Sequence, residues 1–121
     1  YAGIPLTHRD YAQSCVFVTG HLKDDSINLN WTQLAAPNQT IVIYMGLIGL
    51  EKICEALTSH GSDPELPIAV VEKGTTAQQR VIIGTLRTMP NKIRHETLKA
   101  PTLIIIGNVV SLHEKLNWFG R

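Results

Sequence analysis

The chain has 121 residues, of which 44% are hydrophobic, and its formal net charge is +1. This length suits one domain with one core, and the apolar content is that of an ordinary globular protein rather than a disordered one. The charge is too small to indicate nucleic acid or a membrane surface as a general partner. No apolar run approaches the roughly 20 residues that cross a bilayer, and the opening "YAGIPLTHRD" lacks the basic and apolar regions of a signal peptide.

Cysteine and histidine usage gives no metal or redox motif. Cys15 and Cys54 lie far apart in the sequence. A disulfide between them stays open at this point, but two buried thiols in a cytosolic protein are favoured. The five histidines are scattered, and neither CxxC nor HExxH spacing occurs, so no metal site is predicted.

The first third of the chain predicts one strand and a short helix. Residues 1–14 suit an irregular lead-in, because Pro5 disfavours helix before it. Residues 14–22, "SCVFVTGHL", are rich in β-branched and aromatic side chains and predict a strand. After a polar loop, residues 30–37 predict one or two helical turns, with Asn30 as the N-cap and Pro37 as the stop.

A strand followed by a helix is predicted next. Residues 40–46, "TIVIYMG", form a nearly continuous apolar run, which is typical of a strand covered on both faces. Leu50, Ile53 and Leu57 then recur at helical spacing, and Gly61 lies where a helix-ending glycine belongs.

The second half predicts three more strands. Residues 67–74 and 80–86 form two of them, and residues 101–110 form a third, of the buried type. Between them, residues 89–100 suit a short helix with Pro90 in its first turn. Residues 111–119 close the chain as a helical turn whose Trp118 and Phe119 are expected to pack back on the domain. The sum is an α/β domain with about five strands and three or four helices.

Three strand ends are candidates for ligand contact: "YMG" (44–46), "EKGT" (72–75) and the start of "PTLIIIG" (101–107). Ligands of open α/β sheets gather at strand ends, and a glycine there lets a ligand approach the backbone. Each feature also has a structural explanation, because Gly46 and Gly74 suit turns and Met45 suits a core gap. No P-loop, GxGxxG motif, Ser-His-Asp set or catalytic carboxylate pair is found. Pattern alone therefore predicts an α/β domain with a small-ligand crevice.

Five blocks resemble a known family when they are taken together and in order. They are "GIPLTHRDYAQS" (3–14), "LNW" (29–31), "NQTIVIYMGL" (38–47), "EKGTTAQQRVIIGTL" (72–86) and "PTLIIIGNVVSLHEKLNWF" (101–119). This set is similar to the uroporphyrinogen-III C-methyltransferases of the tetrapyrrole methylase family. The last block looks most like the carboxyl-terminal end of siroheme synthases, in which this methyltransferase follows a dehydrogenase/ferrochelatase module.

The resemblance implies a two-lobed enzyme of which residues 1–121 are the C-terminal lobe. The first lobe of the family carries a glycine-rich loop, a "GGD"-like motif and the residues usually given as catalytic, and none of these occurs here. The fold expected is therefore that lobe, with a mixed sheet. The chain is expected to hold no catalytic residue and to have no useful turnover alone. Whether a dehydrogenase/ferrochelatase module precedes it stays open.

The resemblance also implies a cofactor site for S-adenosylmethionine between the lobes. Met45 and Gly74 match positions that contact the cofactor, and Thr102 lies where the family's backbone approaches the adenine. Gly74 would serve by a positive φ or by leaving space, and the sequence does not decide between them. Weaker candidates around the same turn are Thr75, Thr76 and Gln79.

Arg9 is the predicted substrate contact. Uroporphyrinogen III carries many carboxylates, and a guanidinium pairs with a carboxylate in a bidentate fork. The alternative is that Arg9 pairs with Asp10 on the surface. His8 is a weaker candidate, and Arg80 is expected at a strand end as a solvated residue.

The implied reaction is methylation of uroporphyrinogen III at C2 and then C7 to give precorrin-2, in siroheme and cobalamin synthesis. The resemblance also implies a homodimer, whereas the cysteine usage favours a cytoplasmic protein and the small charge gives no reason to expect nucleic acid or membrane as a partner. Two alternatives stay open: another tetrapyrrole methylase of cobalamin synthesis, and a non-catalytic lobe for dimerisation or assembly.

Overall fold

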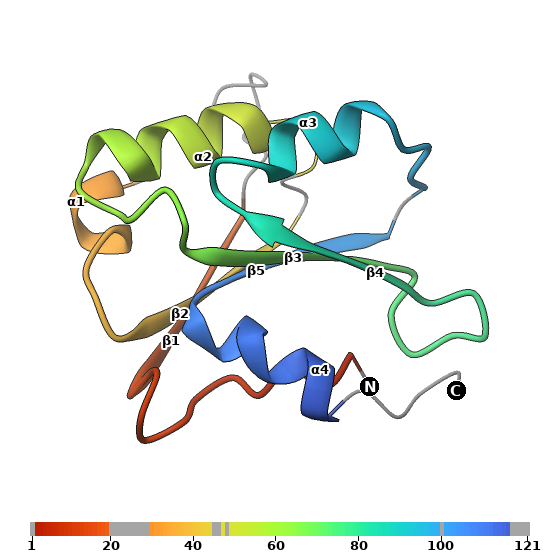
Figure 1. Cartoon of the computed structure of the whole chain (residues 1–121), viewed down its shortest axis with the longest axis horizontal. Coiled ribbons are helices and arrows are strands. Elements are labelled where there is room, and N and C mark those ends of the chain that lie inside the picture. The colour runs from red at the N-terminus through yellow and green to blue at the C-terminus, as the bar shows by residue number, and fades with distance from the viewer. Residues whose placement is uncertain (1, 20–29, 45–46, 48, 100, 117–121) are drawn as a thin grey trace.

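Five strands form one mixed sheet in the spatial order β1-β2-β5-β3-β4 (Figure 1). The computed structural model describes residues 2–19, 30–44, 47, 49–99 and 101–116. The strands are β1 (Ser14–Thr19), β2 (Gln39–Tyr44), β3 (Pro67–Glu72), β4 (Arg80–Thr85) and β5 (Thr102–Ile106). The helices of the described residues are α1 (Trp31–Leu34), α2 (Leu50–Ser59), α3 (Met89–Arg94), the 3-10 helix η1 (Asn108–Leu112) and α4 (His113–Leu116). The predicted α/β class and five-stranded mixed sheet are confirmed.

The strand directions bring distant segments to one edge of the sheet. β1 and β2 run parallel, whereas the β2–β5, β5–β3 and β3–β4 pairs are antiparallel. The carboxyl ends of β1, β2 and β3 therefore lie at the same edge as the amino ends of β4 and β5. We call this edge the site edge, because all three strand ends proposed for ligand contact belong to it.

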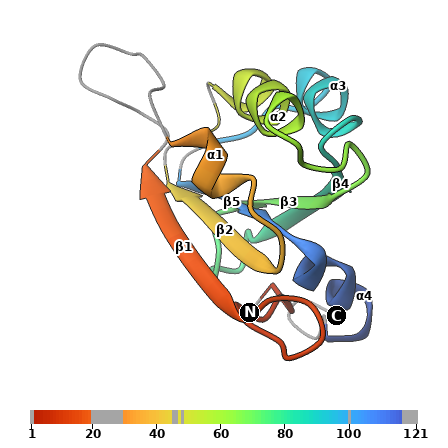
Figure 2. The same cartoon turned by 90° about the vertical axis from the view of Figure 1, so that its left-hand side faces the viewer.

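Both faces of the sheet are covered. Figure 2 shows α1, α2 and α3 on one side and α4 on the other. Ile104 and Ile106 of β5 belong to the core under the helices α1 to α3, whereas Ile105 belongs to the core of the opposite face with Val110 of η1. Each such side chain contributes roughly 1.5–3 kcal/mol by leaving water. Two-sided burial explains why β2 and β5 have continuous apolar sequences.

Helix α2 has the predicted apolar spacing and the predicted ending. Leu50, Ile53 and Leu57 are almost fully buried. After the helix, Gly61 has φ +107° and the amide of Ser62 donates to the carbonyl of Leu57 at 3.0 Å. Glycine adopts this backbone conformation without the steric cost of a Cβ.

The prediction of one strand over residues 101–110 is wrong beyond Ile106. Gly107 has φ +148° and ψ +168°, which redirects the chain, and η1 follows at once. Val109 and Val110 of η1 are buried against the sheet. The apolar run is continuous because a strand and a helix turn are buried one after the other, and periodicity cannot separate them over so short a length.

Other predicted boundaries shift by a few residues. β3 ends at Glu72 rather than at residue 74, because Lys73 adopts φ +50° and leaves the strand. α3 ends at Arg94 rather than at residue 100, and Pro90 lies in its first turn as expected. Asn30 caps α1 as predicted, since its side chain accepts from the amide of Gln33 at 3.2 Å. The ends of the strands predicted over 14–22 and 40–46, and the packing of Trp118 and Phe119, lie outside the described residues.

The two cysteines are free, as favoured from the sequence. Cys54 is buried, but the prediction of two buried thiols is wrong for Cys15, which is only half-buried on the edge strand β1. Among the described helices, none is long and apolar enough to cross a membrane.

Candidate functional site

The site edge is formed by one residue from each strand. Across the sheet these residues are Thr19, Tyr44, Thr102, Glu72 and Arg80. Glu72 is the register partner of both Thr102 and Arg80, so it lies between β5 and β4. The edge therefore unites segments that are far apart in the sequence.

The turn after β3 has an unusual backbone around Gly74. Lys73 and Thr75, on either side of the glycine, both have positive φ, at +50° and +69°. Gly74 itself is not one of the described glycines with positive φ. A Cβ at position 74 would instead lie 3.3 Å from Cγ1 of Val71, which is a tight contact. Of the two reasons left open by the sequence, the structure supports space rather than φ.

The polar residues of the same turn hold the turn itself. The hydroxyl of Thr76 donates to the carbonyl of Lys73 at 2.7 Å, and Oε1 of Gln79 accepts from the amide of Thr75 at 2.8 Å. These side-chain bonds add to the backbone bonds of the turn, in which the amides of Thr76 and Gln79 donate to the carbonyls of Lys73 and Thr76 at 3.2 and 3.0 Å. This is a structural use for Thr75, Thr76 and Gln79, the weaker candidates, and it explains a connection longer than a hairpin needs.

Thr102 is half-buried beside the turn. It begins β5 opposite Glu72, and the amide of Lys73 donates to the carbonyl of the preceding Pro101 at 2.8 Å. The structure thus brings Gly74, in the turn after β3, and Thr102, at the start of the neighbouring β5, to one edge of the sheet; they are two of the three predicted cofactor contacts. The third, Met45, lies outside the described residues; Tyr44 before it ends β2 and pairs with Leu103.

Glu72 is a residue of this edge that the sequence analysis did not propose as part of the site. It is only 7% exposed, and Oε2 accepts from the amide of Lys99 at 2.6 Å. A carboxylate at the end of the apolar run "PIAVVE" was the available signal, because a buried charge needs a partner and is costly without one.

Arg80 begins β4, as expected, but it is not merely solvated. It forms an ion pair with Glu96, which follows α3. The hydrogen bond that Arg80 donates to Glu96, aided by the charges of Glu96 and Glu72, raises the pKa of the guanidinium against a smaller desolvation effect. As an exposed pair it adds little to stability, but it attaches the segment after α3 to the edge.

Arg9 lies away from this cluster. It is in the turn that leads into β1, where the amide of Gln13 donates to the carbonyl of Asn38 at the beginning of β2. This is the end of the sheet opposite to the site edge. Arg9 is exposed and makes no ion pair with Asp10 or any other described residue. His8, by contrast, is used within the turn, since its Nδ1 accepts from the amide of Asp10 at 3.1 Å.

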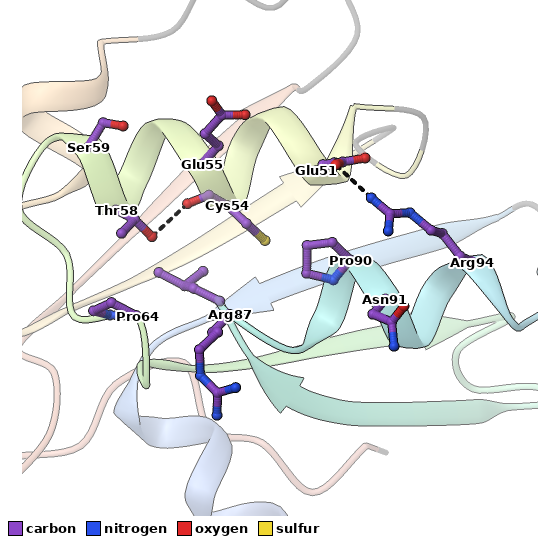
Figure 3. Close-up of a pocket in the computed structure, with 11 residues that line it drawn as sticks. Glu51, Cys54, Glu55, Thr58, Ser59, Pro64, Arg87, Pro90, Asn91 and Arg94 are labelled. Carbon is purple, nitrogen blue, oxygen red and sulfur yellow. Dashed lines mark hydrogen bonds and ion pairs between the residues drawn. The ribbon is translucent and has the colours of Figure 1, made fainter.

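A groove of about 440 Å³ runs between α2 and α3 (Figure 3). Cys54 and Pro90 are among the residues that line it, and burial raises the pKa of the Cys54 thiol to about 12, so the thiol is protonated near neutral pH. Glu51 and Arg94 form an ion pair at 2.6 Å. No residue that begins or ends a strand at the site edge lines the groove, and both arginines that line it are in ion pairs, Arg94 with Glu51 and Arg87 with Glu65, so we do not assign it a role.

No metal centre is found within the described part of the chain. No group of three or more histidine, cysteine, aspartate or glutamate side chains there could hold an ion. The groups that the site edge offers to a ligand are therefore backbone groups, the closely packed Gly74 and the polar side chains that hold the turn around it.

Comparison with known proteins identifies the family. A sequence model of the Tetrapyrrole (Corrin/Porphyrin) Methylases matches residues 1–90. The chain belongs to the tetrapyrrole methylase family. Curated relatives within it are siroheme synthases: that of Nitrosomonas europaea is 63% identical over 98% of this chain, and that of Methylobacillus flagellatus is 62% identical over 98%. The chain spans about a quarter of the length of these relatives, 25% and 26%.

Solved tetrapyrrole methylases share the fold. The uroporphyrin-III C-methyltransferase of Thermus thermophilus, crystallised with S-adenyl homocysteine, superimposes with a TM-score of 0.78 at 29% identity. The match covers 92% of this chain and 49% of that one. A cobalt precorrin-4 methyltransferase superimposes equally well, with a TM-score of 0.78, but at 19% identity it supports the fold alone.

Proposed function

We propose that this chain is the C-terminal lobe of an S-adenosylmethionine-dependent uroporphyrinogen-III C-methyltransferase, which methylates C2 and C7 to give precorrin-2 for siroheme synthesis. The observation that carries the proposal is the identity of 63% to a siroheme synthase along 98% of this chain. The match spans 119 of the 121 residues, so it includes the turn of Gly74 and the start of β5. The structural neighbour that holds S-adenyl homocysteine supports the choice of cofactor.

The geometry of the site edge fits such a cofactor. Gly74 and Thr102 are half-buried, in the turn after β3 and at the start of the neighbouring strand β5, and the glycine presents backbone without a side chain. Backbone N–H and C=O groups at such strand ends recognise flat heterocycles. When bound, the cofactor supplies a methyl group on a sulfonium. The part of these residues is to bind and orient it, since the reaction depends strongly on alignment of donor and acceptor. We assign no catalytic base to this chain.

We propose Arg9 as the residue of this lobe that binds a substrate carboxylate. Its guanidinium is exposed, and no described residue neutralises it. Its position at the far end of β1 from Gly74 suits a large substrate that extends away from the cofactor. The fork of an arginine selects carboxylates by two parallel hydrogen bonds.

We further propose a cytoplasmic homodimer. The support for the compartment is the pair of free cysteines. The support for association is Phe17 and Tyr44, whose stacked rings stay about half-exposed on β1 and β2. The same observation favours the second candidate function, a lobe that serves assembly alone. Sedimentation at several concentrations with and without S-adenosylhomocysteine separates the two, because an assembly lobe dimerises without binding the cofactor.

The experiment that tests the main proposal is calorimetric titration with S-adenosylhomocysteine. It uses the polypeptide that contains this chain, beside Gly74→Trp and the control Ser59→Trp, which adds the same bulk at an exposed position of α2. We expect Gly74→Trp to abolish binding and Ser59→Trp to retain it. Absence of binding by the unaltered protein contradicts the proposal. Analysis of the methylated product then separates this reaction from that of another methylase of cobalamin synthesis.

A further inference from the structure

Glu72 is a buried charge at the centre of the site edge. Glu72 is 7% exposed, and it is the one acidic or basic residue counted as buried among the described residues. Burial of a carboxylate is unfavourable unless hydrogen bonds compensate it, and neutral groups could hold two strands together at lower cost. The presence of a charge here therefore calls for a specific task.

The bonds around Glu72 all lead to the segment before β5. Oε2 of Glu72 accepts from the amide of Lys99 at 2.6 Å, and the amide of the next residue, Lys73, donates to the carbonyl of Pro101 at 2.8 Å. The backbone on both sides of residue 100 is thus attached to the end of β3. A hydrogen bond from an amide to a carboxylate is of the stronger, charge-assisted type.

A third attachment comes from the other strand of the hairpin. Arg80, the register partner of Glu72 on β4, forms its ion pair with Glu96. The two ends of the β3–β4 turn therefore bind Glu96, Lys99 and Pro101, which lie between α3 and β5. Thr102 follows Pro101 directly and faces Glu72 across the β3–β5 pair.

The same residue adjoins the strained turn. Lys73 and Thr75 have positive φ without being glycine, which costs of order 1–3 kcal/mol for each residue and persists only where the surroundings fix it. Glu72 immediately precedes this turn, and the first residue of the turn, Lys73, donates its own amide to Pro101. The Glu72 carboxylate, through its bond to Lys99, acts beside this backbone bond on the relative position of Gly74 and Thr102.

We propose that Glu72 is the positioning residue of the cofactor site: its carboxylate holds the backbone at Lys99, shortly before Thr102, close to the Gly74 turn, so that Gly74 and Thr102 contact the cofactor in register. This inference rests on the proposed function. Glu72 does not touch the reacting atoms in this account; it acts through the backbone that it holds.

The test measures cofactor affinity in the polypeptide that contains this chain. Glu72→Ala should weaken S-adenosylhomocysteine binding by roughly tenfold or more, as loss of a charge-assisted hydrogen bond does. Glu72→Gln keeps an oxygen that accepts from Lys99 but loses the charge, so its loss of affinity should be smaller than that of Glu72→Ala. Glu72→Asp keeps the charge, but its shorter side chain moves the carboxylate oxygen away from the amide of Lys99. It should therefore lower the affinity as Glu72→Ala does, and it replaces Glu72→Ala in the test if that variant does not fold. In turnover, KM for S-adenosylmethionine should rise while KM for the tetrapyrrole stays the same.

Two controls separate positioning from general destabilisation. Val70→Ala removes a fully buried side chain of the same strand and should lower the melting temperature with little change in affinity. Glu65→Ala removes an exposed carboxylate near the opposite end of β3 and should change neither. The inference about Glu72 is overturned, and the proposed function is not, if the affinity for S-adenosylhomocysteine is unchanged in Glu72→Ala and Glu72→Asp or if it falls equally in Val70→Ala. Failure of the unaltered protein to bind overturns the proposed function as well.

Discussion

Gly74 lies directly against Val71, so that a methyl group at position 74 would be 3.3 Å from Cγ1 of Val71. Gly74→Ala should therefore lower the free energy of unfolding by overcrowding, by about 1 kcal/mol, and not by backbone strain. Urea unfolding of the chain measures this. In a double-mutant cycle, the loss of stability caused by the methyl group added at position 74 should vanish when Val71 is changed to alanine.

Gly61 provides the matched control for this first prediction. It has φ +107°, and nothing lies within 4 Å of the position that a Cβ would take. Gly61→Ala should thus be destabilising through strain alone, and no neighbouring truncation should relieve it. If Gly74→Ala costs as much with Val71→Ala as without it, space is not the reason for the glycine.

Gly107 combines both constraints, so its replacement should be the costliest of the glycine changes. Its φ of +148° and ψ of +168° lie in a region that is essentially restricted to glycine. A Cβ would also lie 3.2 Å from the carbonyl oxygen of Gln39, a backbone atom that cannot rotate away. We expect Gly107→Ala to lose about 2–4 kcal/mol in urea unfolding.

Gly84→Ala is the comparison for Gly107. Its Cβ would approach the side-chain ends of Thr88 and Met89, at 3.1 and 3.3 Å, and side chains adjust more easily than backbone. The loss should be smaller than at Gly107. An equal loss in both variants would mean that crowding dominates and that the backbone angle of Gly107 contributes little.

Thr40 is a buried residue whose replacement should stabilise the protein. Its hydroxyl is fully buried and has no hydrogen-bond partner among the described groups. An unsatisfied buried hydroxyl costs about 1–3 kcal/mol, and valine has nearly the same shape without the polar atom. Thr40→Val should therefore raise the free energy of unfolding by about 1 kcal/mol or more, and Thr40→Ser should lower it by leaving a cavity. Loss of stability in Thr40→Val would show that the hydroxyl is satisfied in solution.

The strands were predictable because both faces of the sheet are buried, which produces continuous apolar runs in the sequence. Continuous β-branched runs such as "TIVIY" require both faces covered, and the structure covers both. The end of β5 was not predictable, because Val109 and Val110 continue the apolar run while Gly107 redirects the backbone. The φ of a single glycine cannot be predicted from the sequence, because it depends on how the neighbouring segments pack around it.

The candidate site was partly predictable for a similar reason. Gly74 and Thr102 came from family resemblance, and the sheet order explains why they meet, which no local pattern contains. Glu72 was missed because its partner, the backbone amide of Lys99, lies 27 residues further along the chain and leaves no mark in the sequence. Side chains that bind backbone groups have no complementary residue type to search for.

The buried thiol of Cys54 should make stability depend on alkaline pH. Burial raises its pKa to about 12, above the ordinary value of 9.0. As the pH rises, the unfolded chain therefore loses this proton before the folded chain does. The contribution of the protonated thiol to the free energy of unfolding is complete below pH 9 and is lost as the pH rises toward 12. Between pH 9 and 11, the free energy of unfolding should fall more steeply in the unaltered chain than in Cys54→Ala, by up to about 1.4 kcal/mol per pH unit. Equal slopes would show that the thiol is accessible to water.

Arg9 should affect the tetrapyrrole and not the cofactor. It lies at the end of the sheet opposite to Gly74 and Thr102, and its guanidinium is exposed and unpaired among the described residues. In the polypeptide that contains this chain, Arg9→Leu should raise KM for the carboxylate-rich substrate roughly tenfold, with KM for S-adenosylmethionine unchanged. Arg9→Lys should recover only part of the loss, because an ammonium keeps the charge without the fork.

The matched control for Arg9 is Arg87→Leu. Arg87 is also an exposed arginine, but it donates to Glu65 at 2.6 Å, and such surface pairs contribute little. This variant should leave both KM values unchanged. The effect of Arg9→Leu should also shrink at high salt, since the wild-type contact is screened there. A substrate KM that is the same for Arg9→Leu and Arg87→Leu at low salt would mean that the substrate carboxylates are bound by residues outside this turn, and the cleft would then have to be sought along the site edge alone.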